Sequence, residues 1–349
     1  MTKIEWTRNP DGTPGQSWNW IVGCTLESPG CTHCYAMRQA ARIERMSPDL
    51  EHYVGLTKAS KAGPVWTGKI ADAGWRKLTE PIRRTKPTTW FVNSMADLFH
   101  PGVSVDKIAK TFAVMLLTPR HTYQVLTKRA ARMREIVSAP DFVDDVLNAA
   151  TWLMDRQPVS EAGIEAYRAL RDAAPGAWPL PNVWLGVSAE DQTRADERVP
   201  DLLATPAAVR FVSAEPLLGP IDFNKIDIAA WLRRYRPDSD IGLNAYDPDM
   251  RFPLLSPFEH FGSGASYPGL DWIIVGGESG PSARPMQVPW ARSIVQQCKA
   301  AGVACFVKQL GADPIWEDGA FLNLAHRKGA DMAEWPCDLR VREVPDAAA

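Results

Sequence analysis

Three cysteines lie within eleven residues near the N-terminus, at Cys24, Cys31 and Cys34, with the spacing C-x6-C-x2-C. Close cysteines in a long intracellular chain more often bind metal or do redox chemistry than form disulfides. Structural zinc takes four ligands, whereas three thiolates leave one iron of a [4Fe–4S] cluster open for another ligand. The spacing therefore favours a cluster with an open iron. Zinc completed by His33, His52 or a distant cysteine is the alternative.

The other three cysteines, Cys298, Cys305 and Cys337, lie far downstream and show no comparable spacing. Cys298 falls in the helical pattern Trp290–Ala301, and Cys305 falls in the strand-like run Val303–Val307. A free cysteine in such an element usually packs like a small apolar side chain. We therefore predict that these thiols are buried and do not hold the metal.

Short apolar runs alternate with helical patterns along the chain. The predicted strands are Ser17–Gly23, Trp90–Ser94, Tyr123–Thr127, Val183–Ser188, Val209–Ser213, Trp272–Gly277 and Val303–Lys308. The predicted helices are Tyr35–Arg45, Val105–Leu117, Ala130–Val137 and Trp290–Ala301. Apolar runs with little alternation are typical of parallel strands that are buried on both faces. Strand and helix in alternation indicate a parallel α/β sheet or barrel, here with fewer than eight strands.

The length of 349 residues fits two domains of about 150 residues each or one α/β barrel. The strand count favours one barrel domain over residues 1–349, with insertions at about 140–181 and 223–269. The first insertion contains two helical runs. The second begins with a basic piece around Arg233, Arg234 and Arg236 and continues as a loop rich in proline and glycine. Long irregular segments in a compact domain are usually functional.

Polar residues follow most of the predicted strands. In parallel α/β folds ligands bind beyond the carboxyl ends of the strands, so these residues are candidates for binding a cofactor. The predicted set is Asn93, Ser94, Lys128, Ser188, Glu190, Glu215, Gly276, Gly277 and Glu278. The carboxylates of the protein could bind an amine and ribose hydroxyls of a ligand, and Lys128 or Arg129 could bind a carboxylate of the same ligand. A zwitterionic ligand that carries a ribose would have all of these groups. The alternative is that these charges pair with one another.

The overall composition limits the possible partners. Lys and Arg number 39 against 41 Asp and Glu, and this balance disfavours a broad basic surface for nucleic acid. No apolar run approaches the roughly 20 residues of a membrane span, and the N-terminus lacks the apolar segment of a secretory signal. We therefore expect a cytoplasmic protein that does not associate with a membrane.

The motifs resemble a phage and bacterial family with a three-cysteine signature, which is similar to radical S-adenosylmethionine (SAM) enzymes and, among them, to spore photoproduct lyase. The resemblance covers most of the chain. It is carried by Ile4–Thr7, Gly23–Ala36, Phe91–Phe99, Leu126–Arg129, Leu185–Ser188, Ser213–Leu217, Val275–Gly280 and Phe306–Gln309. The usual radical SAM spacing is C-x3-C-x2-C, whereas the first gap here has six residues. His33 also stands where an aromatic residue is common, with Tyr35 following the last cysteine.

The resemblance implies a partial (βα)6-type TIM barrel and a [4Fe–4S] cluster held by Cys24, Cys31 and Cys34. The open iron would chelate the amine and carboxylate of SAM. Its reductive cleavage, with an electron from flavodoxin or ferredoxin, would give methionine and a 5′-deoxyadenosyl radical. The cofactors would thus carry the radical chemistry.

The resemblance further suggests a modified thymine base in DNA, or the modified nucleotide, as the substrate. The favoured reaction is an isomerisation of glycinyl-thymidine in phage DNA hypermodification. Lys128, Arg129 and the basic piece could contact phosphates, and some of the 14 tryptophans could stack on bases. One alternative is a repair lyase, which would need a thiol near the substrate, such as Cys298, Cys305 or Cys337. The other is a zinc-stabilised nucleic-acid-binding module without catalysis.

Overall fold

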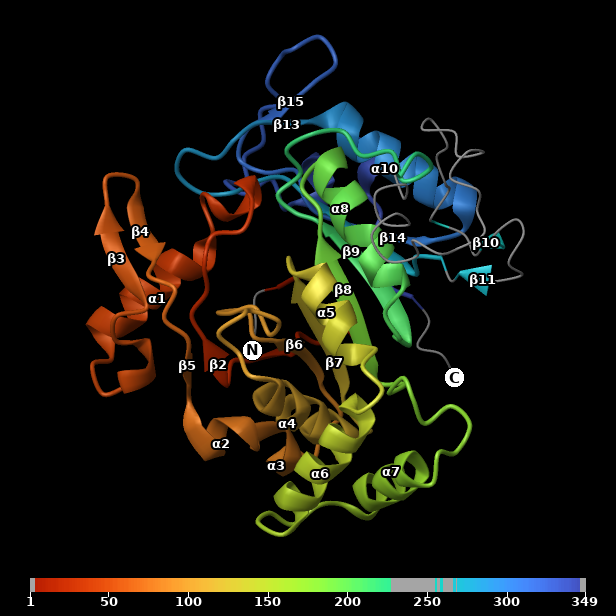
Figure 1. The fold of residues 1–349 in the computed structure, drawn as a ribbon. Helices are drawn as coiled ribbons and strands as arrows, with labels where there is room; N and C mark the ends of the chain where they lie inside the picture. The colour runs from red at the N-terminus through yellow and green to blue at the C-terminus, as the bar shows by residue number, and fades with distance from the viewer. Residues whose placement is uncertain (1–3, 227–254, 256–257, 260–265, 268, 346–349) are drawn as a thin grey trace, which may run out of the picture. The chain divides into compact units, whose positions relative to one another are not determined.

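The computed structural model describes residues 4–226, 255, 258–259, 266–267 and 269–345 (Figure 1). The chain divides into two compact units. Unit 1 comprises Met1–Leu185 and Pro206–Ala208, and unit 2 comprises Gly186–Thr205 and Val209–Ala349. Within the described ranges, no helix is long and apolar enough to cross a membrane.

Seven strands form the main sheet in the order β1-β6-β7-β8-β9-β12-β14. This spatial order follows the order along the chain, as in a barrel, and does not reverse as it does in doubly wound sheets. The prediction of an α/β fold with a partial TIM-barrel sheet is therefore confirmed. The strand β8 (Val183–Ser188) begins in unit 1 and ends in unit 2, so the two units are described separately below.

In unit 1, parallel pairing joins β1 to β6 and β6 to β7. The strands of this unit are β1 (Gln16–Trp18), β2 (Ile21–Val22), β3 (Thr57–Ser60), β4 (Gly63–Trp66), β5 (Ala71–Asp72), β6 (Thr89–Val92) and β7 (Thr122–Thr127). Trp18, Trp90 and Tyr123 are almost fully buried in adjacent strands. Burying such large aromatic side chains supplies much of the free energy that holds a sheet core together.

Helices cover the strands of unit 1. They are α1 (Tyr35–Met46), α2 (Gly74–Leu78), α3 (Glu80–Arg83), α4 (Val105–Leu116), α5 (Ala130–Val137), α6 (Phe142–Met154) and α7 (Glu161–Arg171), with short 3-10 turns at Pro29–Cys31 and Glu51–Tyr53. The helix α4 begins at Ser104, whose hydroxyl accepts a hydrogen bond from the backbone N–H of Lys107. Its apolar face packs on α6, where the rings of Phe112 and Phe142 meet edge to face at 5.3 Å. The helical runs predicted for the first insertion are α6 and α7.

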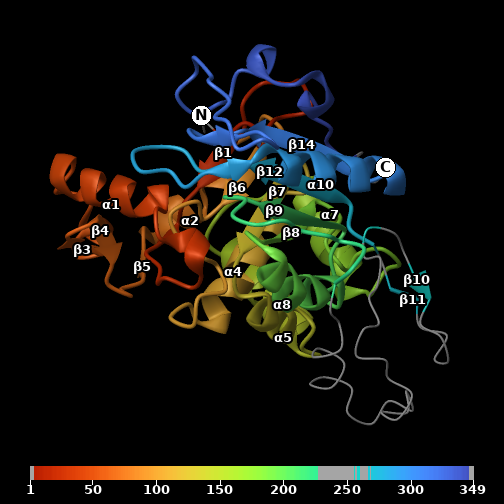
Figure 2. The same ribbon diagram turned by 90° about the horizontal axis from the view of Figure 1, so that it is seen from above.

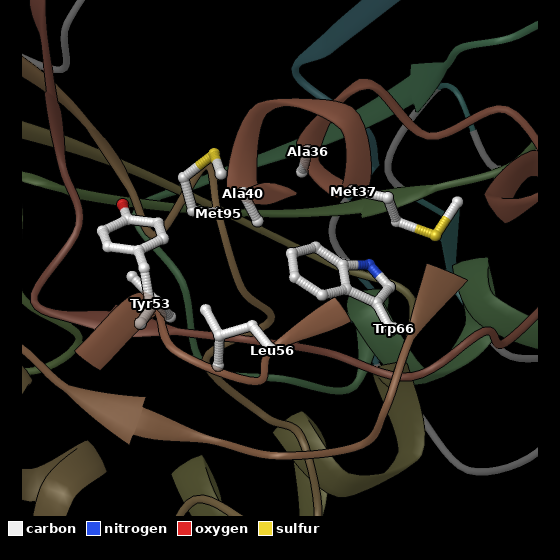
Figure 3. Close-up of a cluster of buried hydrophobic side chains, with 8 residues drawn as sticks. Ala36, Met37, Ala40, Tyr53, Leu56, Trp66 and Met95 are labelled. Atoms are coloured by element: carbon white, nitrogen blue, oxygen red, sulfur yellow. The ribbon is translucent and has the colours of Figure 1, made fainter. Parts of the chain in front are cut away.

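A small separate core lies beside the cysteines. It consists of Val22, Ala36, Met37, Ala40, Tyr53, Leu56, Trp66 and Met95, most of which Figure 3 shows. One face of α1 provides three of these side chains, and the antiparallel β3–β4 hairpin packs against the same helix. Cys24 and Cys34 pack against this core.

Unit 2 contains the other strands of the main sheet. Its elements are α8 (Gln192–Leu203), β9 (Val209–Ala214), β10 (Phe258–Glu259), β11 (Ser266–Tyr267), β12 (Trp272–Gly276), β13 (Met286–Gln287), α10 (Val288–Ala301), β14 (Ala304–Gln309) and β15 (Pro314–Ile315), with 3-10 turns at Met332–Glu334 and Cys337–Leu339. Parallel pairing joins β9 to β12 and β12 to β14, and α10 lies along β12 and β14 (Figure 2). Gly186 in β8 makes room for the ring of Phe211, because a Cβ there would lie 2.5 Å from that ring.

Two sequence predictions need correction. The predicted strand Ser17–Gly23 is two short strands, β1 and β2, because the chain turns at Asn19–Trp20 and β2 then pairs with β5 instead of entering the main sheet. The helix α8 was not predicted, because its sequence is strongly polar and contains Pro200. The basic piece with Arg233, Arg234 and Arg236, and most of the predicted insertion at 223–269, lie outside the described residues.

Candidate metal centre

The three N-terminal cysteines lie on one loop of unit 1, between β2 and α1. The loop begins at Gly23, whose φ of 97° suits glycine. The backbone N–H of Gly23 donates to the carbonyl of Met95 at 3.0 Å, and a Cβ here would lie 2.0 Å from the carbonyl oxygen of Lys69. Cys31 closes the turn Pro29–Cys31, and Cys34 is the residue that caps α1. The loop is therefore held by both neighbouring segments.

Backbone groups surround the three sulfurs. The Cys24 thiol donates to the carbonyl of Thr25 at 3.4 Å, and the Cys31 sulfur accepts from the backbone N–H of Glu27 at 3.4 Å. Hydrogen bonds from the first backbone N–H groups of α1, at Ala36 and Met37, favour the thiolate of Cys34. Such N–H groups at a helix N-terminus stabilise negative charge on sulfur. All three cysteines are free.

Arg129 is a buried cation that joins the loop to the end of β7. Its guanidinium donates to Asp97 Oδ2 at 2.7 Å and to Thr25 Oγ1 at 2.8 Å. It also forms an ion pair with Glu27 at 3.1 Å and lies 3.9 Å from the sulfur of Cys24. One cation therefore contacts the cysteine loop and the segment after β6 together.

Asp97 is held in place on the other side of this ion pair. Its carboxylate accepts from the hydroxyl of Thr127 at 2.7 Å and from the backbone N–H of Lys128 at 3.1 Å. The backbone N–H of Phe99 also donates to it, at 3.0 Å. A buried charge pair is stable only when its remaining hydrogen-bonding groups have partners, and these donors supply them.

Burial controls the protonation of two thiols of the loop, those of Cys24 and Cys34. Burial and the nearby Asp97 carboxylate together raise the pKa of the Cys24 thiol to about 12, against the opposing charge of Arg129. Burial likewise raises the pKa of Cys34, and the charge of Lys128 opposes this effect. Without metal, these two thiols are neutral near pH 7. Binding a metal would therefore replace their protons.

The donor set can be tested against the two metal groups that the sequence suggested. Among the described residues, no three His, Cys, Asp or Glu side chains gather closely enough to hold one metal ion. The cysteines, with His33 or His52, therefore do not form a zinc tetrahedron as they are placed. An iron–sulfur cluster spreads its ligands over different irons, and N–H groups directed at sulfur are typical of its surroundings. Three thiols on one loop with such N–H groups fit a cluster.

Three residues of the predicted cofactor set belong to the same unit as the cysteines. Asn93 follows β6 with a φ of 54°, and its Oδ1 accepts from the backbone N–H of Ile21 at 3.3 Å. Its side-chain Nδ2 is buried and has no hydrogen-bond partner among the described residues. The hydroxyl of Ser94 donates to Asn19 Oδ1 at 3.1 Å, and Lys128 lies close enough to Cys34 to affect its pKa.

The other predicted cofactor residues lie in unit 2, where each carboxylate has a basic partner. Glu190 is fully buried and pairs with Arg198 at 3.1 Å, and Arg198 also donates to the carbonyl of Ser188 at 2.8 Å. The remaining pairs are Glu215 with Lys308 at 2.9 Å and Glu278 with Arg284 at 2.7 Å. These carboxylates are therefore ion-paired, as the alternative interpretation of the sequence expected. The sequence did not identify which basic residues are their partners.

Other parts of the protein fill the space beside the glycine pair at the end of β12, Gly276 and Gly277. A Cβ on Gly276 would lie 2.5 Å from Oε1 of Glu215, and a Cβ on Gly277 would lie 2.3 Å from the carbonyl oxygen of Leu310. The carbonyl of Gly277 accepts from the side-chain amide of Gln309 at 2.9 Å. Both glycines are therefore explained by close packing.

Sequence reasoning missed three residues of the cysteine loop's surroundings, Thr25, Glu27 and His100. Nε2 of His100 lies 3.0 Å from the hydroxyl of Thr25, while its Nδ1 accepts from the backbone N–H of Gly102. Burial lowers the pKa of His100. The proximity of Thr25 and Glu27 to the cysteines was a signal, but the link to His100 spans 75 residues and has no local signature.

The downstream cysteines lie in unit 2. Cys298 in α10 and Cys305 in β14 are buried, as the sequence predicts, and the Cys305 thiol is hydrogen-bonded to that of Cys298. This contact and burial raise the pKa of Cys305 strongly. Cys337 is exposed in the turn Cys337–Leu339, so the prediction that it is buried is wrong.

The fold and the cysteine loop define an α/β protein with a partial-barrel parallel sheet, an architecture common among enzymes. The chain belongs to the family described as "Protein of unknown function (DUF5131)", whose model matches residues 1–334. Neither the curated proteins nor the solved structures include a match to the chain.

Proposed function

We propose that the protein is an iron–sulfur enzyme of the radical SAM class, with a [4Fe–4S] cluster on Cys24, Cys31 and Cys34. The observation that carries this proposal is the loop itself. Three free cysteines share one segment, backbone N–H groups donate to the sulfurs of Cys31 and Cys34, and a buried cation lies beside Cys24. When bound, the cluster would supply the electron that cleaves SAM to methionine and a 5′-deoxyadenosyl radical.

The chain's own charges suit this role. Arg129 lies beside Cys24, and Lys128 affects Cys34, so two cations act on the sulfurs from the end of β7. Positive charge and N–H donors near sulfur favour added negative charge there, and they are known to tune the potential of such clusters. Asp97 fixes Arg129 in this position and does not itself contact a sulfur in the described contacts.

We further propose that residues after β6 and β7 bind SAM. The unpaired Nδ2 of Asn93 is a buried donor that a ligand oxygen would satisfy. Lys128 offers a positive charge for a carboxylate. The carboxylates Glu190, Glu215 and Glu278 remain predicted contacts, and each would first have to release its Arg or Lys partner.

For the reaction, we propose rearrangement of a modified thymine base, with the isomerisation of glycinyl-thymidine as the leading candidate. This step rests on the resemblance of the motifs. A repair lyase would need a reactive thiol near its substrate. Cys298 and Cys305 are buried and hydrogen-bonded to each other, which makes them poor nucleophiles, whereas Cys337 is exposed and is the thiol that a lyase would use. The resemblance of the motifs keeps the isomerase as the leading candidate.

The test of the enzyme class is anaerobic reconstitution with iron and sulfide, followed by reduction with dithionite in the presence of SAM. We expect a brown protein that releases 5′-deoxyadenosine, with methionine as the second product. A loaded cluster that yields no 5′-deoxyadenosine would refute the radical SAM assignment. A colourless protein with stoichiometric zinc would favour the binding module instead. Mass spectrometry of nucleosides after incubation with glycinyl-thymidine DNA would test the isomerisation.

A further inference from the structure

The exposed face of α1 carries a row of four residues, which we call the α1 stripe: Tyr35, Arg38, Arg42 and Arg45. All four side chains are exposed. Their spacing of three, four and three residues places them on one face of the helix. The stripe begins next to Cys34, and the hydroxyl of Tyr35 donates to the carbonyl of Ser94 at 3.0 Å. It therefore starts at the cysteine loop and runs away from it.

The opposite face of α1 is already used. Ala36, Met37 and Ala40 are buried in the small core that Figure 3 shows. The helix is thus fixed in unit 1 by its apolar side, and its orientation presents the arginines to solvent. A partner that bound α1 would meet three arginines, the ring of Tyr35 and, at the far end of the helix, the exposed side chain of Met46.

The charges of the stripe are not balanced within the protein. Arg38 and Arg42 are four residues apart, and Arg42 and Arg45 are three apart, so like charges are neighbours on the helix and destabilise it slightly. Among the described contacts none of these arginines forms an ion pair, and Arg42 contacts the sulfur of Met46. No acidic residue stands in the first turn of α1.

Two other helices of the chain pair basic residues with acidic ones on the same helix. In α4, Lys110 pairs with Asp106 at 2.8 Å, and in α8, Arg194 pairs with Glu197 at 2.8 Å. An ordinary solvated helix face gains from such pairs. The segment from residue 35 to residue 70 contains six basic and three acidic residues, although the whole chain has a net charge of −2. The positive charge is therefore concentrated near the cysteines.

We propose that the α1 stripe binds the phosphates of a DNA strand and delivers it to the cysteine site. Arg38 to Arg45 spans about 10 Å of helix, which matches about three nucleotides of a strand at 3.4 Å each. Tyr35, at the end nearest the cysteines, is placed to stack on a base. This inference makes the substrate a polymer instead of a free nucleotide. The delivery of the strand to the cysteine site rests on the proposed function.

An anionic membrane is a poorer partner for the same charges. A helix that binds a bilayer inserts its apolar face between the lipids. In α1 that face is buried in the protein by Ala36, Met37 and Ala40. The exposed side of α1 offers arginines, which form bidentate contacts with phosphate, and an aromatic ring, a combination typical of nucleic-acid surfaces.

The experiment measures binding of a fluorescein-labelled single-stranded oligonucleotide by anisotropy at several salt concentrations. The variant is Arg38→Gln/Arg42→Gln/Arg45→Gln, since glutamine favours helix as arginine does. Each lost phosphate contact lowers the salt slope by about 0.7, so three lost contacts weaken binding roughly 100-fold at about 0.1 M salt. A triple Arg→Lys variant keeps the three positive charges and should keep most of the affinity. This result would show that the glutamine variant binds weakly because it lost charge and not because it misfolds.

The matched control removes three exposed cations elsewhere, in Arg168→Gln/Arg327→Gln/Lys328→Gln. It should bind like the wild type. Equal weakening of both triple variants would overturn the inference, because net charge would then explain the binding. Absence of binding by the wild type, or stronger binding to anionic vesicles than to DNA, would overturn it too. None of these outcomes touches the proposed enzyme class, because cluster content and 5′-deoxyadenosine release are measured without DNA.

Discussion

The cysteine loop of unit 1 and the strand ends of unit 2 both collect charged side chains, but they balance the charge in different ways. In unit 2, Glu190, Glu215 and Glu278 each have their own arginine or lysine. In unit 1, Arg129 alone contacts Asp97, Glu27 and the sulfur of Cys24.

This difference identifies which region is built to hold something. A carboxylate with its own cation is satisfied and loses a partner when it binds a ligand. In the cysteine loop, burial keeps the thiols of Cys24 and Cys34 protonated in the absence of metal. A cationic metal group would replace these protons without breaking an existing ion pair, and so the loop is the stronger candidate for a functional site.

The largest expected effect is the loss of iron when a cysteine is removed. In Cys31→Ala we expect reconstitution to leave almost no iron or sulfide on the protein, because a cluster with two protein thiolates is poorly held. Cys305→Ala is the matched control, since Cys305 is equally buried but lies in unit 2. Iron and sulfide analysis with the visible absorption spectrum would check both. Full iron content in Cys31→Ala would refute the ligand assignment.

Replacing Arg129, the cation that several groups of the cysteine loop share, should show most clearly how the two regions differ. Arg129→Gln leaves Asp97 buried without its partner, and such a change costs about 3–5 kcal/mol of stability. Removing a residue that orients a ligand also weakens metal binding about 10- to 100-fold. Chemical denaturation and iron titration would measure the two effects.

Arg198→Gln serves as the control for this change, because it removes the arginine that forms an ion pair with the fully buried Glu190. It should lower stability by a similar amount and leave iron binding unchanged. Arg129→Lys should recover part of both losses. If both glutamine variants bind iron like the wild type, Arg129 has only a structural role.

Acid should destabilise the protein through a buried neutral histidine of unit 1. His121 accepts from the backbone N–H of Thr88 at 3.1 Å, and its other nitrogen lies 3.0 Å from the carbonyl oxygen of Pro81. Burial lowers the pKa of His121 from 6.5 to about 4. The unfolded chain therefore binds the proton more readily, and stability falls by about 3 kcal/mol as the pH drops from about 6.5 to about 4.

Denaturant titrations at a series of pH values would measure this loss. His121→Asn should be less stable at pH 7 but should lose less stability on acidification. A variant whose pH dependence matches that of the wild type would show that other groups, such as the carboxylates of unit 2, govern the acid response.

The smallest expected effect follows from opening one ion pair in unit 2. Lys308→Ala removes the partner of Glu215, which keeps a hydrogen bond from the hydroxyl of Ser213 at 3.2 Å. Because both charged groups are partly exposed, we expect a loss of about 1 kcal/mol. Iron content should not change. Thermal unfolding would detect the loss. A fall in bound iron would show that the ion pairs of unit 2 contribute to metal binding, which contradicts the difference between the two regions.

The sequence predicted most strands of the main sheet well, because their signal was local, but it did not predict the short strands outside that sheet. The bounds of β8 agree with the predicted run Val183–Ser188, and α5 agrees with Ala130–Val137. These elements are continuous apolar runs or clear helical repeats. The helix α8 was missed because its sequence is strongly polar, with Arg198 and Asp201 buried at positions where an apolar residue is expected, and because it contains Pro200.

The candidate site could be predicted only in part. Cys24, Cys31 and Cys34 have a spacing that chemistry can interpret, so they stood out without a structure. The contact between Arg129 and Cys24 joins residues 105 positions apart, and nothing in either local sequence announces it. Glu190 and Arg198 are only eight positions apart, but their pairing depends on how α8 folds back on the end of β8, and α8 was not predicted.

The small core under α1 has a consequence for the order of folding. Its members Ala36 to Trp66 are near one another in sequence, whereas pairing of β12 with β9 joins residues about 60 positions apart. Contacts that are local in sequence form fast. We therefore expect α1 and the β3–β4 hairpin to assemble early and to present the cysteines while much of the sheet is still forming. Pulse-labelling hydrogen exchange would test this, since amides of β4 should gain protection before those of β12.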